Sequence, residues 1–141
     1  MKDPRLPLQA ACVVALKAAI TAAGYTSSGD RVLVDPEHAE SYPYAVIGNT
    51  TVIDFPTKTT KGGECTFSFT AWGDSWTSAM TFADYCLRAL TDDDNPILPT
   101  GYTTAQGGRL DFAGDTIRDE QPPNTYWGLP VRVRFKLVEA P

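Results

Sequence analysis

Two hydrophobic patterns follow one another along residues 63–90. In residues 64–71, Phe67 and Phe69 belong to an apolar set that alternates with Glu64 and three hydroxyl residues. This period of two predicts a strand with one buried face. Gly73-Asp74 ends the pattern, and Asp74 or Ser75 can cap the helix that follows. The apolar stripe of that helix recurs at spacings of three and four and consists of Trp76, Ala79, Met80, Ala83, Cys86, Leu87 and Leu90.

The clearest strand lies near the end of the chain. Its apolar members occupy every odd position: Trp127, Leu129, Val131, Val133, Phe135 and Leu137. Arg132, Arg134 and Lys136 occupy even positions and form a basic stripe on the other face. This stripe is a candidate binding surface, and the alternative is cross-strand pairing with acidic neighbours such as Glu64. Pro130 places the early part of the strand at an edge or a bulge.

The rest of the chain supplies one more helix and three more strands. The first helix follows Pro7 and ends near Gly24, and its predicted buried stripe is Leu8, Cys12, Ala15, Leu16 and Ala19. Strands are expected at residues 31–34, at residues 44–53 with a bulge at Gly48-Asn49, and at residues 109–117 with a kink at Gly114. Residues 119–124 are interpreted as a polar turn.

These elements predict an α+β fold in the order α-β-β-β-α-β-β. Short connections favour an antiparallel or mixed sheet of about five strands, with both helices packed on one face. We expect one domain over residues 1–141. The predicted core contains side chains from two strands and from the second helix, namely Phe67, Phe69, Met80, Leu87, Val133 and Phe135.

The connection Asp54–Gly63 is longer than an ordinary hairpin loop of about two to five residues. It is either a solvated connection or a binding arm, because long loops of ordered domains often carry function. Its candidate assembly residues are Asp54, Phe55, Thr57, Lys58, Thr59, Thr60, Lys61 and Gly62.

Composition and charge restrict the function further. The chain has 43% hydrophobic residues and a formal net charge of −5 without a long basic run, which argues against tight binding to nucleic acid. We expect no apolar stretch to reach membrane-spanning length. The three cysteines, Cys12, Cys65 and Cys86, fall at apolar positions and match no zinc spacing, so we interpret them as reduced core thiols.

Catalytic signatures are missing from the sequence. It contains no phosphate loop, dinucleotide fingerprint, zinc-protease helix or nucleophile elbow. His38 and the carboxylates Asp35, Glu37 and Glu40 share a loop and are interpreted as solvated. The run Asp92-Asp93-Asp94 lacks the spacing of a calcium loop and is also interpreted as solvated, although the sequence leaves cation binding open. We therefore assign no catalytic, metal or cofactor-binding residue and expect no enzyme activity.

An ordered set of short motifs resembles the tail-completion (tail terminator) proteins of long-tailed bacteriophages and gene transfer agents. The motifs extend over nearly the full length in the same order. They are Asp3-Pro4-Arg5 before Leu8-Gln9-Ala10-Ala11, Pro43-Tyr44-Ala45-Val46-Ile47-Gly48, Asp54 with Thr57-Lys58, Gly62-Gly63-Glu64, Ala71-Trp72, and Tyr126-Trp127-Gly128. The loop around Asp92 and the Pro122-Pro123 pair depart from that pattern.

The resemblance implies a structural virion protein. Such proteins form a homo-oligomeric ring, commonly a hexamer, that caps the tail tube, stops its polymerisation and offers a surface to the head–tail connector. DNA would pass through the ring without sequence-specific binding, and an acidic chain suits such a channel. Assembly would take place in the host bacterial cytoplasm, without a membrane. Two alternatives remain: another neck protein, such as a connector adaptor or head-closure protein, and a small α+β enzyme or ligand-binding domain.

Overall fold

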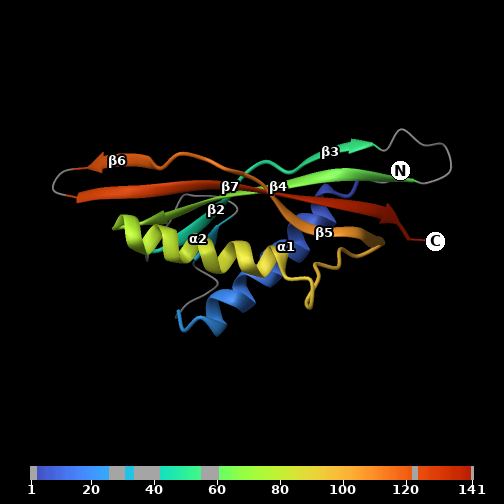
Figure 1. The fold of residues 1–141 in the computed structure, drawn as a ribbon, viewed down its shortest axis with the longest axis horizontal. Coiled ribbons are helices and arrows are strands. Elements are labelled where there is room, and N and C mark those ends of the chain that lie inside the picture. Colours follow the sequence, from blue (N-terminus) through green and yellow to red (C-terminus); the bar gives the residue numbers. More distant parts are fainter. Residues whose placement is uncertain (1–2, 26–30, 34–41, 55–60, 122–123, 141) are drawn as a thin grey trace.

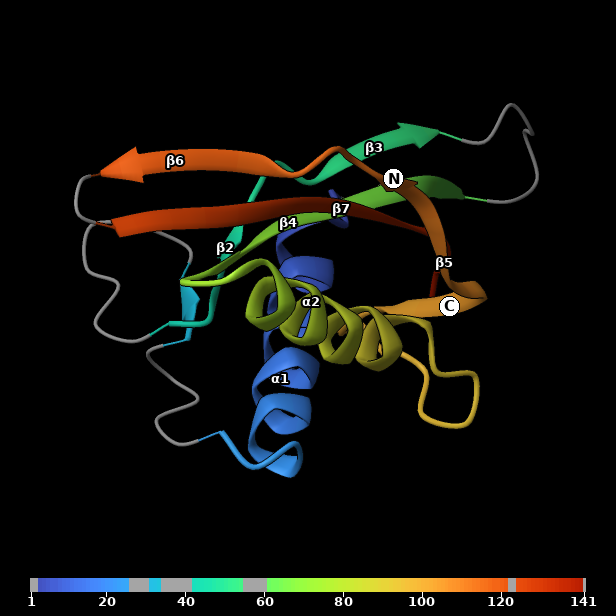
Figure 2. The same cartoon turned by 60° about the vertical axis from the view of Figure 1, so that its left-hand side comes forward.

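A computed structural model of the chain describes residues 3–25, 31–33, 42–54, 61–121 and 124–140. Both helices lie on one face of a single sheet, and no described helix covers the other face, which we call the open face (Figures 1 and 2). The elements are α1 (Arg5–Ala22), β1 (Val32–Leu33), β2 (Tyr44–Ile47), β3 (Thr51–Asp54), β4 (Gly62–Gly73), α2 (Trp76–Thr91), β5 (Tyr102–Ala113), β6 (Ile117–Gln121) and β7 (Asn124–Glu139).

The sheet is organised around β4 and β7, which pair antiparallel in the centre over the full length of β4 and over residues 127–138 of β7. The outer edge of β4 carries β2 and β3, and the outer edge of β7 carries β5 and β6. β1 adds to β2 in parallel, and every other pairing is antiparallel. The predicted α+β class is therefore confirmed, with a mixed sheet and both helices on one face.

Seven strands are assigned in the described residues, but they occupy only five positions across the sheet. β2 and β3 are two halves of one predicted strand, interrupted at Gly48, whose N–H still donates to the Ser68 carbonyl oxygen at 2.8 Å. β5 and β6 are likewise interrupted at Gly114, whose N–H donates to the Pro130 carbonyl oxygen at 2.8 Å. Both breaks fall at the predicted glycines. Pro130 has no N–H to donate and lies opposite the second break, so the bulge reading is right and the edge reading is wrong.

α1 ends where the sequence predicts. Gly24 has a φ of +93°, and the N–H groups of Gly24 and Tyr25 donate to the carbonyl oxygens of Thr21 and Ile20. This is the Schellman arrangement that a glycine after a helix permits. The side chains of α1 that are buried are Leu8, Cys12, Leu16 and Ile20, so the stripe is close to the predicted one, with Ile20 added.

By length and composition, α1 could also cross a membrane. The prediction that no apolar stretch reaches that length is therefore wrong. Core helices of soluble proteins have the same length and composition, and here α1 packs against α2 and places one face in the core.

α2 begins at the predicted cap, because the Ser75 hydroxyl accepts a hydrogen bond from the Ser78 N–H at 3.1 Å. Its buried face is rotated from the predicted stripe. Met80 is 42% exposed and Trp76 is half exposed, whereas Phe82 is fully buried. Placing Met80 in the core was therefore wrong, since Phe82 supplies the large apolar side chain on the face that meets the sheet. Phe67, Phe69, Val133 and Phe135 are buried as predicted, and Leu87 packs against them partly buried.

α2 approaches β5 closely at Gly108, which predicts a position sensitive to substitution. A Cβ at Gly108 would overlap the carbonyl oxygen of Leu90 at the end of α2. Because a backbone carbonyl cannot rotate away, Gly108→Ala should lower the free energy of unfolding by about 3 kcal/mol, the upper part of the usual overpacking range. Urea unfolding measures this change.

Gly107 provides the matched control. A Cβ there would meet only the Asp93 carboxylate at 3.7 Å and the Arg109 guanidinium at 3.8 Å, which are ordinary contacts. Gly107→Ala should therefore change the free energy of unfolding by less than about 1 kcal/mol. Equal losses in both variants would show that α2 does not approach β5 at Gly108.

Candidate assembly surface

The open face of the sheet is polar because of the alternation along β4 and β7. Thr66, Ser68 and Thr70 of β4 project away from the helices and are partly exposed. Arg132 and Arg134 of β7 lie opposite Ser68 and Thr66 in the strand register. The predicted basic stripe therefore lies on the face that no helix covers.

The two arginines of this stripe contact side chains on neighbouring strands. The Arg134 guanidinium lies 3.2 Å from the Glu64 carboxylate and 3.8 Å from that of Asp111. The Arg132 guanidinium lies 4.7 Å from the centre of the Phe112 ring, and Lys136 lies directly opposite Glu64. Cross-strand pairing, the alternative raised by the sequence, is thus present. These pairs are solvent-exposed, so each contributes about 1 kcal/mol or less to stability. Binding by the stripe stays a prediction.

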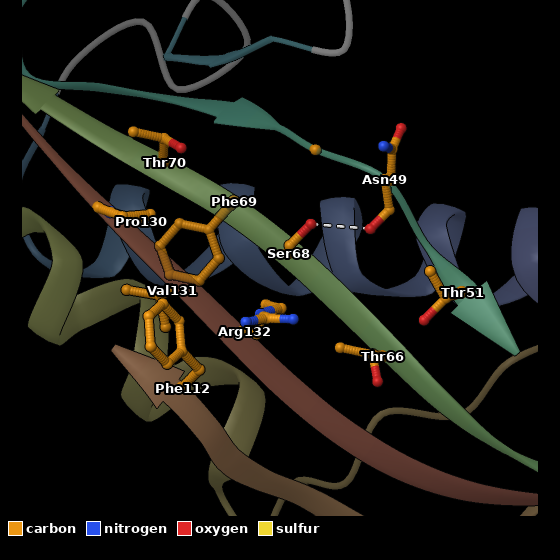
Figure 3. Close-up of a pocket in the computed structure, with 11 residues that line it drawn as sticks. Asn49, Thr51, Thr66, Ser68, Phe69, Thr70, Phe112, Pro130, Val131 and Arg132 are labelled. Carbon is orange, nitrogen blue, oxygen red and sulfur yellow. Dashed lines mark hydrogen bonds between the residues drawn. The ribbon is translucent and has the colours of Figure 1, made fainter. Parts of the chain in front are cut away.

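A cleft of about 420 Å³ lies on this open face, where β2 bends into β3 (Figure 3). The Ser68 hydroxyl donates to the Asn49 carbonyl oxygen at 2.7 Å across the bend. The residues that line the cleft include Asn49, Thr51, Thr66, Ser68, Thr70, Phe112, Pro130 and Arg132.

The chemistry of the cleft favours contact with a polar surface. Its hydroxyl groups and one guanidinium can hydrogen-bond a polar or anionic segment. Among the residues that the structure describes, no histidine or carboxylate lines it to act as a general base. Among the described residues, no group of three or more His, Cys, Asp or Glu side chains could hold a metal ion.

The candidate arm of the sequence joins β3 to β4. Asp54 ends β3, Gly62 begins β4, and the Lys61 carbonyl oxygen accepts a hydrogen bond from the Glu139 N–H at 2.8 Å. Phe55, Thr57, Lys58, Thr59 and Thr60 lie outside the described residues. The two ends of the arm are therefore placed at the tip of the β3–β4 pair, and its role stays a prediction.

The carboxylates of Asp92 and Asp93, after α2, form hydrogen bonds and an ion pair within the chain. The Asp92 carboxylate accepts hydrogen bonds from the Asn95 side-chain amide at 3.0 Å and the Asp94 N–H at 2.9 Å, which lower its pKa. The Asp93 carboxylate pairs with Arg109 at 2.9 Å. These contacts stabilise the loop and tie it to β5. His38 and its neighbouring carboxylates lie outside the described residues.

All three thiols are free and buried, as predicted. Burial raises the pKa of Cys65 to about 11 and that of Cys86 to about 12, and raises that of Cys12 further. Because the thiolate is the reactive form, burial and a raised pKa both slow modification.

The native protein should therefore react slowly with a thiol reagent at pH 8, modifying fewer than two thiols before unfolding. Titration with a chromogenic disulfide, followed by addition of guanidinium chloride, should release the full count of three cysteines. Rapid modification of two or more thiols in the native protein would contradict the core positions of the cysteines.

The sequence analysis missed a hairpin formed by β6 and β7. Residues 119–121, interpreted as part of a turn, belong to β6 and pair with residues 124–126. Tyr42 packs against the middle of the hairpin, where its ring stacks on Tyr126 at 4.6 Å between ring centres. The end of the hairpin projects past the helices (Figure 1). The signal that could have revealed it is the Pro122-Pro123 pair between two extended segments.

Two solved structures share this fold over most of both chains. One belongs to the virion of a native gene transfer agent particle, with a TM-score of 0.58 and 17% identity over 86% of this chain and 93% of that chain. The other is the bacteriophage SPP1 gp17 protein, with a TM-score of 0.53 and 26% identity over 91% of this chain and 86% of that chain. No known family matches the chain, and no curated protein does.

Proposed function

We propose that this chain is a structural virion protein that forms a ring on the end of a phage or gene transfer agent tail tube. The ring would end polymerisation of the tube and present the tail-side surface for joining to the head. The observation that carries the proposal is the fold shared nearly end to end with a gene transfer agent virion chain and with SPP1 gp17. That similarity supports a structural role in a phage or phage-like particle. The terminator role rests on the ordered motifs of the sequence.

The surface of the protein is compatible with assembly rather than catalysis. The cleft on the open face is lined by hydroxyl groups, Arg132 and apolar side chains such as Phe112, with no general base among the described lining residues, so it supports contact with a partner better than a reaction. We propose no enzyme activity and no cofactor. The end of the sheet that carries β3, and the β6–β7 hairpin at the other end, project beyond the helices and offer strand edges to neighbours (Figure 1).

The overall charge suits a channel for DNA. A formal net charge of −5 repels a phosphate backbone. The partners proposed are other copies of this chain, the tail tube protein and the head–tail connector, with DNA passing through without sequence recognition.

Native mass spectrometry, with and without the tube protein of the same particle, tests the ring. We expect a closed oligomer, six copies being the first expectation, whose fraction rises when tube protein is present. A protein that stays monomeric at all concentrations, and in the presence of tubes, would contradict the proposal.

Electron microscopy of the mixture distinguishes the terminator from another neck protein. A terminator should be found at one end of every tube and should limit tube length. An adaptor or head-closure protein should instead bind to the head vertex and leave tube length unchanged.

A further inference from the structure

The rim of the sheet contains strands with very different capacities for pairing with another chain. In the described part of the molecule, β1, β3, β5 and β6 each pair on one side only. β1 has two residues. β5 is long, but its register with β7 shifts at three places. Such bulges twist an edge and prevent regular pairing. The two remaining edges, β3 and β6, are the ones suited to receive a strand.

β3 has the composition of an inner strand although it lies at the rim. Thr51, Val52 and Ile53 are β-branched and pair with β4 in unbroken register. Ile53 lies opposite Glu64, on the open face, and is 71% exposed. Its cross-strand neighbour Glu64 is charged, and the described residues leave most of the surface of Ile53 uncovered.

β6, at the other rim, shares the unbroken register and an exposed isoleucine, although its other four residues are polar or charged. Its five residues pair with β7 without a register shift. Ile117 lies opposite Gly128 and is 45% exposed. Gly128 belongs to the even-numbered set of β7 that includes Arg132, so Ile117 is on the open face too. Each free edge therefore carries one exposed isoleucine on the same face of the sheet.

The positions of the two edges determine how copies could join. β3 lies on the outer edge of β4 and β6 on the outer edge of β7, at opposite ends of the long axis of the molecule (Figure 1). An edge that meets a different edge on the next copy makes a head-to-tail contact, which can repeat and close into a ring. An edge that meets itself would stop at a dimer.

We infer that β3 of one copy pairs with β6 of the next copy, extending the sheet from subunit to subunit and bringing Ile53 beside Ile117. This inference rests on the proposed ring and names its subunit interface. Main-chain hydrogen bonds would supply the pairing, and the two isoleucines would bury their exposed surfaces as a cross-strand pair. The arm at residues 54–62 would begin at this boundary, because β3 ends at Asp54.

Disulfide trapping between two single variants tests the contact. Ile53→Cys and Ile117→Cys are purified separately, mixed with and without the tube protein, and oxidised with diamide. Both sites are exposed, and the native cysteines are buried. We expect the mixture to form a reducible covalent dimer at least tenfold faster than either variant alone. The double variant in one chain should form a ladder of covalent oligomers that ends at the ring size.

Leu110→Cys on the bulged β5 edge is the matched control, because Leu110 is also half exposed. Its mixture with Ile53→Cys should cross-link no faster than the single variants. Equal rates in the control and the test mixtures would overturn the inference, and so would fast dimer formation by Ile53→Cys alone, which would indicate that β3 pairs with itself.

The native mass of the unmodified protein separates failure of the inference from failure of the proposed function. A ring without the Ile53–Ile117 cross-link would overturn the interface and leave the ring standing. A cross-link in a protein that neither caps tubes nor limits their length would support the interface and contradict the terminator role. A protein that stays monomeric and forms no cross-link would overturn both.

Discussion

Phe135→Ala should lower the free energy of unfolding by about 3–5 kcal/mol. Phe135 lies in β7, between β4 and β5, and its side chain has no exposed surface. It is opposite Cys65 in the register, in the cluster that joins the sheet to α1 and α2. Removing the ring would lose the free energy gained by transferring it from water to the core. It would also leave a cavity, because β7 is paired with strands on both sides and cannot move to fill it. Denaturant unfolding, monitored by tryptophan fluorescence, measures this loss of stability.

Phe112→Ala is the matched control for this change. Phe112 is on the open face, is 46% exposed, and contacts the Arg132 guanidinium. Its removal should cost about 1 kcal/mol or less, since a partly exposed ring and one cation–π contact are lost. A Phe135→Ala loss below about 1 kcal/mol would mean that the two faces of β7 have been reversed.

Shortening residues 57–61 to a tight turn should abolish tail capping and leave the fold intact. β3 and β4 are held in register from Thr51–Thr66 to Asp54–Gly63, so the pairing does not depend on the length of the connection. The register of this pair does not require the extra residues, whereas a binding arm would need them to reach a neighbouring subunit or the tube. Thermal melting and a tail-assembly assay measure the two effects.

A variant that keeps the original length of the arm but has Gly and Ser at residues 57–60 tests whether capping needs the length of the arm or its side chains. If Lys58 and the threonines make specific contacts, this variant should also lose capping while melting normally. The shortened turn should retain a residue at position 61, because the main-chain carbonyl oxygen there accepts a hydrogen bond from the Glu139 N–H. A shortened protein that melts normally and still gives tails of correct length would show that the arm is only a connection.

The sequence alone determined the centre of the fold. Phe67 and Phe69, and Val133 and Phe135, alternate with polar residues over long segments, and a one-residue shift would move all of them to the wrong face. Gly48 and Gly114 marked the two places where outer strands bend. The sequence also predicted the cap at Ser75 and the end of α1 at Gly24, because each depends on one local residue type.

The tertiary structure decided the features that depend on distant neighbours. Several stripes of α2 are apolar, and only docking on β4 and β7 chose the one with Phe82 and left Met80 at the surface. β6 is polar along most of its length, so its sequence pattern does not predict a strand. Its pairing with β7 in the folded protein defines it. Which strands end at the rim is likewise a property of the assembled sheet. The candidate interface of β3 and β6 could therefore not be found in the sequence, because a free edge is defined by the strands that do not pair with it.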